Sequence, residues 1–178
     1  FIVSSMRRLR GMDSNGSGKM ERENISIGIA YNAYDPVINR PEERLSEASV
    51  ADVAESVFSA LTDSGYSAVV LPLRESLMSL LRRVRELKVD VLINLCEGYL
   101  GRPQLESNVA AVFEAFGIAF TGNSSKALAI CQDKFKSKAI LDSFGLPTAR
   151  GRLVTSIDQK LGLRFPVIVK PNHEDASL

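Results

Sequence analysis

The sequence predicts an α/β protein built on a doubly wound parallel sheet. Short apolar segments alternate with amphipathic helical patterns between residues 25 and 122. The clearest apolar segment, Val89 to Leu95 (VDVLINL), is interrupted only by Asp90 and Asn94, as is typical of a parallel strand buried on both faces. Strand and helix alternate along this region, and right-handed crossovers turn such an order into a parallel sheet.

Composition narrows the class of protein. The chain has 178 residues, which predicts one domain or one domain plus a fragment, and 45% of them are hydrophobic, enough for a packed core. Its 22 Lys and Arg balance 21 Asp and Glu, so the net charge of +1 argues against a nucleic-acid partner. Cys96 and Cys131 lie far apart in a chain with one His, which predicts neither a zinc site nor a disulfide.

No apolar run approaches the roughly 20 residues that cross a membrane, and the start lacks the features of a signal peptide. We therefore expect a cytoplasmic protein without a membrane partner. Residues 1–24 are rich in Gly, Ser, Asn and charge and show no periodicity, which predicts a disordered leader.

The first two strands and helices follow from periodicity. Residues 25–31 (ISIGIAY) are predicted to form a strand, and the polar outlet 32–43 is too long for a simple turn. A helix is predicted over residues 47–64, with Ser49 and Asp52 as a capping box. A second strand is expected at 67–73 and a second helix at 76–87, with leucines facing inward and Arg82, Arg83 and Arg85 facing outward.

The third strand opens into a polar loop, residues 96–104, before the next helix. Val109, Val112, Phe113 and Phe116 have the i, i+3, i+4, i+7 spacing of an apolar helical face, and residues 118–120 resume an extended pattern. In such sheets ligands bind where strands end, so this loop is a candidate site. No G-x-G-x-x-G follows the first strand, which argues against a nicotinamide-dependent dehydrogenase. The predicted core comprises Val53, Val57, Val69, Leu80, Val91, Ile93, Val109, Val112 and Phe113.

The pattern changes after Gly122. A short helix is predicted at 124–131 and an amphipathic one at 133–144, with Phe135, Ala139, Ile140 and Phe144 on its apolar side. Two further strands are expected at 152–155 and 165–170, separated by a helical turn at 156–161. These strands lack partners in the sequence, which predicts a second domain that begins near residue 150 and is cut off.

Four pieces of the chain resemble the ATP-grasp superfamily, and within it the D-alanine–D-alanine ligases and their close relatives. The pieces are DVLINLCE from Asp90; residues 105–122, continuing into GNSS; Asp133-Lys134 with Lys138 and GLPT from Gly145; and FPVIVKP from Phe165, followed by residues 174–178. The resemblance as a whole covers about residues 25–178. The resemblance implies a pre-ATP-grasp domain at 25–122, connecting helices at 123–150, and the truncated start of the ATP-grasp central domain at 151–178.

The resemblance also implies a function. The complete protein would be an ATP-dependent ligase that joins a carboxylate to an amine through an acyl phosphate. ATP and Mg²⁺ would be its cofactors, with the magnesium ligands beyond residue 178, and its substrate would be a small amino-acid-like molecule. The fragment alone is expected to be inactive, and the complete protein is expected to be able to form a homodimer.

Site residues follow from matching positions. A lysine at a strand end and another at a helix start can converge on one polyanion, and the resemblance gives Lys134 and Lys170 contacts with the nucleotide. Glu174 and Ser177 would belong to the loop that closes over the phosphates. In the first outlet the acidic substrate residue would be Glu47, or Glu43. From their charges, Glu97 and Arg102 are candidates to bind a substrate ammonium and carboxylate.

Departures from the family pattern leave alternatives open. Cys96 and Glu97 stand where the D-alanine ligases have His-Gly, and Cys96 is predicted to be a small buried hydrophobe. Asp175 and Ala176 replace a usual glycine and serine. A related carboxylate–amine ligase is therefore one alternative to a D-alanine ligase. The others are a non-catalytic flavodoxin-like binding module and a structural domain whose last strands pair with a partner chain.

Overall fold

The computed structural model describes residues 25–37, 44–74 and 76–173, and the side chains of the first helix from residue 48 on. The predicted leader at 1–24 lies outside this range. The strands are β1 (Ser26–Asn32), β2 (Ser67–Leu73), β3 (Val91–Leu95) and β4 (Ala119–Phe120). The helices are α1 (Arg44–Asp63), α2 (Leu77–Glu86), α3 (Glu106–Ala115), α4 (Ser125–Cys131) and α5 (Lys134–Ser143), with a 3₁₀ turn, Pro103–Leu105, before α3.

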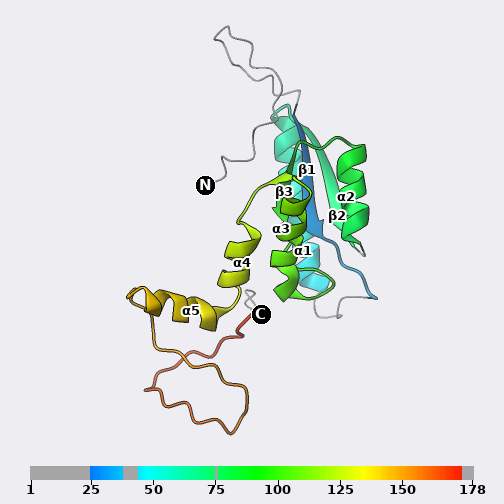
Figure 1. Cartoon of the computed structure of the whole chain (residues 1–178). Coiled ribbons are helices and arrows are strands. Elements are labelled where there is room, and N and C mark those ends of the chain that lie inside the picture. The colour runs from blue at the N-terminus through cyan, green and yellow to red at the C-terminus, as the bar shows by residue number, and fades with distance from the viewer. Residues whose placement is uncertain (1–24, 38–43, 75, 174–178) are drawn as a thin grey trace, which may run out of the picture.

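The four strands form one parallel sheet in the order β2-β1-β3-β4 (Figure 1). Gly28 at the centre of β1 pairs with Val69 of β2 and Leu92 of β3. A strand order that reverses at β1 places the following helices on opposite faces. The predicted doubly wound parallel sheet is therefore confirmed.

Hydrophobic side chains from α2, α3 and three strands form the main core on one face of the sheet. Its buried members are Ala30, Leu71, Leu73, Leu80, Leu81, Val84, Leu92, Cys96, Val109 and Phe113. The opposite face of β1 presents Ile27 and Ile29, and there α1 packs on β1 and β2, with Ala54 fully buried. Successive residues of a strand point to opposite faces, so Ile29 and Ala30 belong to different layers of one sandwich.

Gly28 is required by this packing. A Cβ atom there would lie 2.7 Å from Cδ2 of Leu92 and 2.8 Å from Cδ1 of Leu71. Those leucines fill the space over the central strand, so the missing side chain lets its two neighbours close over β1.

The structure corrects two predictions about the helices on the sheet. α1 starts at Arg44, so Ser49 lies inside the helix and the predicted capping box is wrong. Val53 is 48% exposed, so it is not buried in the core as predicted, and Phe116 on the predicted apolar helical face is 42% exposed. Apolar spacing marks one face of a helix, but only part of that face is covered, since Ala54 beside Val53 is fully buried. Phe116 instead lies 5.2 Å from the guanidinium carbon of Arg85, a cation–π contact.

The chain after β4 leads away from the sheet (Figure 1). α4 packs against α3, where Glu114 accepts hydrogen bonds from the backbone N–H and hydroxyl of Ser125 at 2.9 and 2.5 Å. α5 follows within one residue of its predicted bounds, but its predicted apolar side is exposed, since Phe135 and Phe144 are 42% and 77% accessible.

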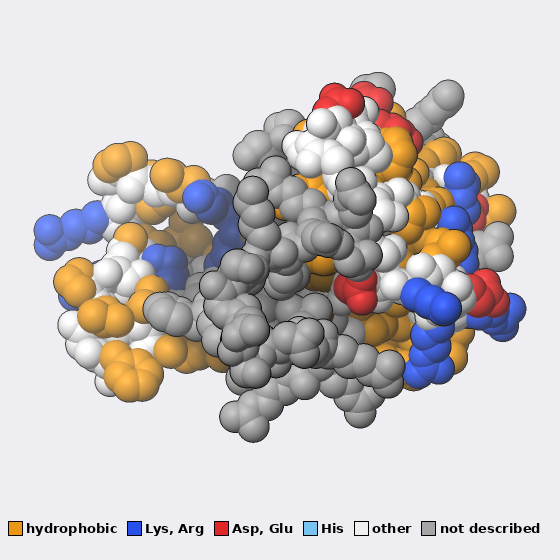
Figure 2. Space-filling view, turned by 90° about the horizontal axis from the view of Figure 1, so that it is seen from above, with side chains coloured by type: hydrophobic (Ala, Val, Ile, Leu, Met, Phe, Trp, Pro, Cys, Tyr) orange, Lys and Arg blue, Asp and Glu red, His pale blue; other side chains and the backbone are white. Residues whose placement is uncertain are grey.

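Residues 146–173 contain no regular strand. The strands predicted at 152–155 and 165–170 are therefore wrong for the described chain. A strand exists only when its backbone groups pair with a neighbour, and these segments have none among the described residues. The lobe on the left of Figure 2, formed by α5 and the chain after it, exposes hydrophobic and basic side chains together. No described helix is long and apolar enough to cross a membrane.

Candidate functional site

The loop after β3 is held in place by the end of β1. The side-chain amide of Asn32 donates to the carbonyl of Gly98 at 3.0 Å and accepts from the backbone N–H of Glu97 at 2.7 Å. Inside β3, Asn94 accepts from the backbone N–H of Cys96 at 3.2 Å. Asn32 and Asn94 thus fix the backbone conformation where β3 ends and the loop begins.

The same loop contains a tight turn. Tyr99 and Arg102 exchange two backbone hydrogen bonds, of 3.2 and 3.1 Å, around Leu100 and Gly101. Both central residues have positive φ, 53° and 64°, as in a type I′ turn. Gly98 precedes this turn, and a Cβ there would lie 2.8 Å from the carbonyl oxygen of Arg102. The close approach explains a glycine at this position.

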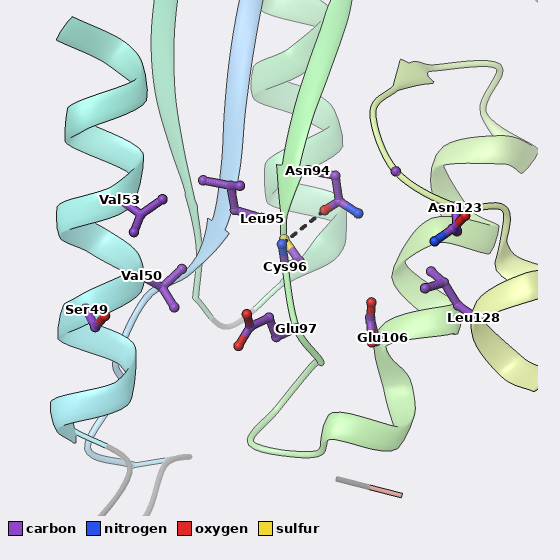
Figure 3. A pocket seen from close by; sticks show the side chains of 11 residues that line it. Ser49, Val50, Val53, Asn94, Leu95, Cys96, Glu97, Glu106, Asn123 and Leu128 are labelled. Carbon is purple, nitrogen blue, oxygen red and sulfur yellow. Dashed lines mark hydrogen bonds between the residues drawn. The ribbon is translucent and has the colours of Figure 1, made fainter. Parts of the chain in front are cut away.

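A hollow of about 380 Å³ opens at this edge of the sheet, between α1 and the start of α4 (Figure 3). α1 contributes Ser49, Val50 and Val53, and the end of β3 contributes Asn94 to Glu97. The far wall is made by Glu106, Gly122, Asn123 and Leu128. Part of this lining is apolar, and Glu97 and Glu106 contribute two carboxylates to it.

The hollow contains some of the predicted substrate residues and not others. Glu97 lines it and is exposed to solvent, as a ligand contact requires. Arg102 is exposed on the turn and is not among the lining residues. The side chain of Glu47 and the whole of Glu43 lie outside the described residues. Cys96 is 3% exposed, as predicted for a small hydrophobe.

Sequence reasoning missed Glu106. This residue starts α3, lines the hollow opposite Glu97, and accepts a hydrogen bond of 2.7 Å from the side-chain amide of Gln132. Gln132 is 7% exposed and also donates to the carbonyl of Pro103 at 2.9 Å, so the end of α4 fixes Glu106. An acidic residue in the first turn of a helix is a common stabilising feature, and nothing in the sequence separates that role from binding.

The predicted nucleotide lysines lie around the start of α5. Lys134 is the first residue of the helix, and its backbone N–H donates to the carbonyl of Asn172 at 3.1 Å. Lys170 is exposed and stands two residues before Asn172. A two-residue separation spans at most about 7 Å between Cα atoms. Glu174 and Ser177 lie outside the described residues.

Asp133 caps α5. Its carboxylate accepts from the backbone N–H of Lys136 at 2.9 Å and from the side-chain amide of Asn172 at 2.9 Å, and it pairs with the ammonium of Lys136 at 3.0 Å. The backbone bond from Lys136 and the bond from Asn172 are the main causes that hold the pKa of Asp133 well below its ordinary value. Asp133 is therefore a carboxylate at neutral pH.

The described residues contain no group of three His, Cys, Asp or Glu side chains that could hold a metal ion. Glu97 and Glu106 alone do not make the oxygen-rich shell that Mg²⁺ needs. The described part of the chain therefore contains no ligand set for the magnesium that the resemblance implies.

Comparison with known proteins supplies the family. No family model matches the chain. The D-alanine–D-alanine ligase of Pseudomonas entomophila is 30% identical over 69% of this chain and 38% of its own length. That of Glaesserella parasuis is 33% identical over 70% of this chain and 41% of its own. The uncharacterised protein y4sG of Sinorhizobium fredii is 29% identical over 84% of this chain and 47% of its own.

Among solved structures, the fold is similar to D-alanine–D-alanine ligase from Bacillus anthracis complexed with ATP. The TM-score is 0.59 at 20% identity, over 78% of this chain and 42% of that one. The fold and the sequence similarity together relate the chain to the ATP-grasp ligases. Within that class it is a relative of the D-alanine–D-alanine ligases, and it spans 38–41% of the length of the two curated ligases compared above.

Proposed function

We propose that this chain is part of an ATP-dependent ligase that joins a carboxylate to the amine of a small amino-acid-like substrate. The observation that carries the proposal is its similarity to D-alanine–D-alanine ligases over 69% of its length. In the reaction, the γ-phosphoryl group of ATP passes to the substrate carboxylate and ADP leaves. The amine then attacks the acyl phosphate, forms the amide bond and expels inorganic phosphate. The described part of the chain would contribute substrate and nucleotide contacts.

The hollow at the end of β3 is the proposed substrate pocket. Its size suits a small amino acid, since it measures about 380 Å³. Glu97 supplies a negative charge for a substrate ammonium, and Glu106 faces it from the other wall (Figure 3). Val50, Val53 and Leu95 offer apolar surface to a small side chain. Arg102 remains a candidate for the substrate carboxylate if its turn moves towards the pocket.

The nucleotide would be held at the start of α5. Lys134 and Lys170 are the proposed phosphate contacts, with Glu174 and Ser177 as further nucleotide-binding residues. Charge-assisted hydrogen bonds of this kind contribute roughly 1.5–3 kcal/mol each. The 178-residue chain alone would not turn over, because its described residues hold no cluster that could bind magnesium.

The test is release of phosphate from ATP by the full-length protein, measured with panels of amino acids. The proposal expects release that requires both ATP and an amine acceptor, with a dipeptide or amide as the product. Glu97→Gln should raise KM for the amine about tenfold or more, since one charge-assisted contact is lost. Glu86→Gln on α2, which is exposed and distant from the hollow, is the matched control. Specific ligand binding without phosphate release under any condition would favour the binding-module alternative.

A further inference from the structure

The N-terminal amides of α5 are already occupied by the protein itself. The backbone N–H of Lys134 donates to the carbonyl oxygen of Asn172 at 3.1 Å, and that of Phe135 donates to the Oδ1 atom of Asn172 at 2.9 Å. The next two amides, of Lys136 and Ser137, donate to Asp133, to its carboxylate at 2.9 Å and to its carbonyl at 2.8 Å. The N–H groups of Lys134, Phe135 and Lys136 are among those that a helix normally leaves unpaired at its start, and all three are satisfied here. The N–H of Ser137 makes the first backbone bond of the helix itself.

Asn172 closes this arrangement from a distant part of the chain. Its side-chain amide also donates to the carboxylate of Asp133 at 2.9 Å, so one residue makes three hydrogen bonds to residues 133–135. We call these three bonds the Asn172 clasp. The side chain of Asn172 both accepts and donates here, which a carboxylate or a hydroxyl alone cannot reproduce with the same geometry.

The clasp fixes one end of a long loop on α5. At the other end, the ammonium of Lys138 donates to the carbonyl oxygen of Ala149 at 2.6 Å. The chain between these anchors runs out from α5 and returns to its N-terminal end (Figure 1). Lys170 lies within about 7 Å of Asn172 along the chain, so the clasp holds Lys170 at the same end of the helix as Lys134.

We propose that Asn172 is a positioning residue that holds the segment carrying Lys170 against the N-terminus of α5. In this position Lys134 and Lys170 bind the same nucleotide phosphate. This inference rests on the proposed function. The inference adds that the lysine side chains, and not the helix amides, bind the phosphate. Those amides are hydrogen-bonded to Asn172 and Asp133, and the carboxylate of Asp133 lies beside them. A phosphate seated on the helix N-terminus would have to displace the clasp.

The clasp itself is tested without nucleotide, by amide hydrogen exchange of the 178-residue chain. Asn172→Ala should accelerate exchange at Lys134 and Phe135 about tenfold, as expected for loss of one hydrogen bond of ordinary strength, and should leave β1 and β3 unchanged. Gln159→Ala is the matched control, since among the described residues its side-chain amide bonds Thr155 and Leu153, both within the loop. Unchanged exchange at Lys134 and Phe135 would overturn the clasp.

Swapping the side chains of residues 133 and 172 distinguishes loss of the Asn172 clasp from a general loss of stability. Asn172→Asp alone removes the donor to Asp133 and sets two carboxylates together, so it should open the clasp. The double variant Asp133→Asn/Asn172→Asp restores a donor, the acceptor for Phe135 and the net charge, and it should recover both the slow exchange and the affinity for ATP. Failure of the double variant to recover either one would contradict the pairing.

The functional arm uses the full-length protein. Asn172→Ala should raise KM for ATP about tenfold with a smaller change in kcat. Lys170→Met should weaken ATP binding strongly in the wild type, but less when it is introduced into the Asn172→Ala variant. Full additivity of the two changes would overturn the positioning role. If the wild type binds no ATP, the proposed function and this role fall together, while the exchange measurement still decides whether the clasp exists.

Discussion

Asp133 shows how one residue can hold a junction between distant segments. Its carboxylate accepts from the backbone of Lys136 and from Asn172, and those bonds favour the ionised form. The same carboxylate lies beside the ammonium of Lys136 at 3.0 Å. The capping interaction therefore depends on the charge of Asp133 as well as on its shape.

The first prediction concerns pH. Because the pKa of Asp133 is lowered in the folded chain, its contribution to stability is fully present above the ordinary aspartate value of about 4 and is lost as the pH falls towards the folded value. Amide exchange at Phe135 and Lys136 should therefore accelerate in acid relative to β3. Asp133→Asn should remove this pH dependence. Identical acid profiles in the wild type and the variant would show that Asp133 does not control the junction.

At the scale of elements, the sheet and its covering helices depend on a few fully buried side chains. Phe113 is completely buried in α3 and meets the ring of Phe120 edge to face, with centroids 5.6 Å apart. Phe116 stands three residues further on, at the C-terminal cap of the same helix, and is 42% exposed. The pair allows one substitution to be compared at two depths of the same element.

We expect Phe113→Ala to lower the free energy of unfolding by about 3–5 kcal/mol, because it removes a large side chain from a packed core. Phe116→Ala should lower the free energy of unfolding by only about 1 kcal/mol, because it removes a partly exposed ring and its cation–π contact. Urea melts of both variants make the comparison. A loss below about 1 kcal/mol for Phe113→Ala would contradict the assignment of α3 to the core.

These elements show what periodicity can predict. The strand at 67–73 was predicted with its observed bounds, and the helices at 76–87 and 133–144 within one or two residues, because their apolar spacing records which side is buried. The start of α1 was missed because a plausible capping pair, Ser49 and Asp52, lies inside the helix. Val53 was misplaced because spacing gives the direction of an apolar stripe and not the width of the surface that covers it.

The candidate site was harder to predict than the fold. Glu97 could be found because it follows a buried strand, where parallel sheets bind ligands. Glu106 and Asn172 could not, since their roles depend on contacts with Gln132 and Asp133, which lie 26 and 39 residues away. Such pairings are set by how the chain folds back on itself, and a single sequence carries no local signal for them.

At the scale of the whole molecule, the region after α5 differs from the sheet domain. It lacks regular strands and exposes large apolar side chains, among them Ile157, Phe165, Ile168 and Val169 at 78–98% accessibility. Few buried apolar contacts and solvent-exposed backbone predict low local stability. The division of the chain into domains near residue 150 remains a prediction that this contrast supports.

Hydrogen exchange can measure this contrast directly. We expect the amides of residues 167–169 to exchange rapidly, while those of Val91 and Ile93, which lie in a strand paired on both sides, exchange slowly. Equal protection of the two segments would show that the region after α5 is as stable as the sheet, and the predicted boundary would then be wrong.

ATP titration of the full-length protein tests most directly whether this chain contributes to an ATP-dependent ligase. Lys170→Met and Lys134→Met should each weaken ATP binding about ten- to a hundredfold, since each removes a charge-assisted contact. Lys160→Met, from the same loop as Lys170, should leave the affinity unchanged, and thermal melts should show equal stability for all variants. Equal ATP affinities for the wild type and both variants, at equal stability, would remove these lysines from the site and contradict the account.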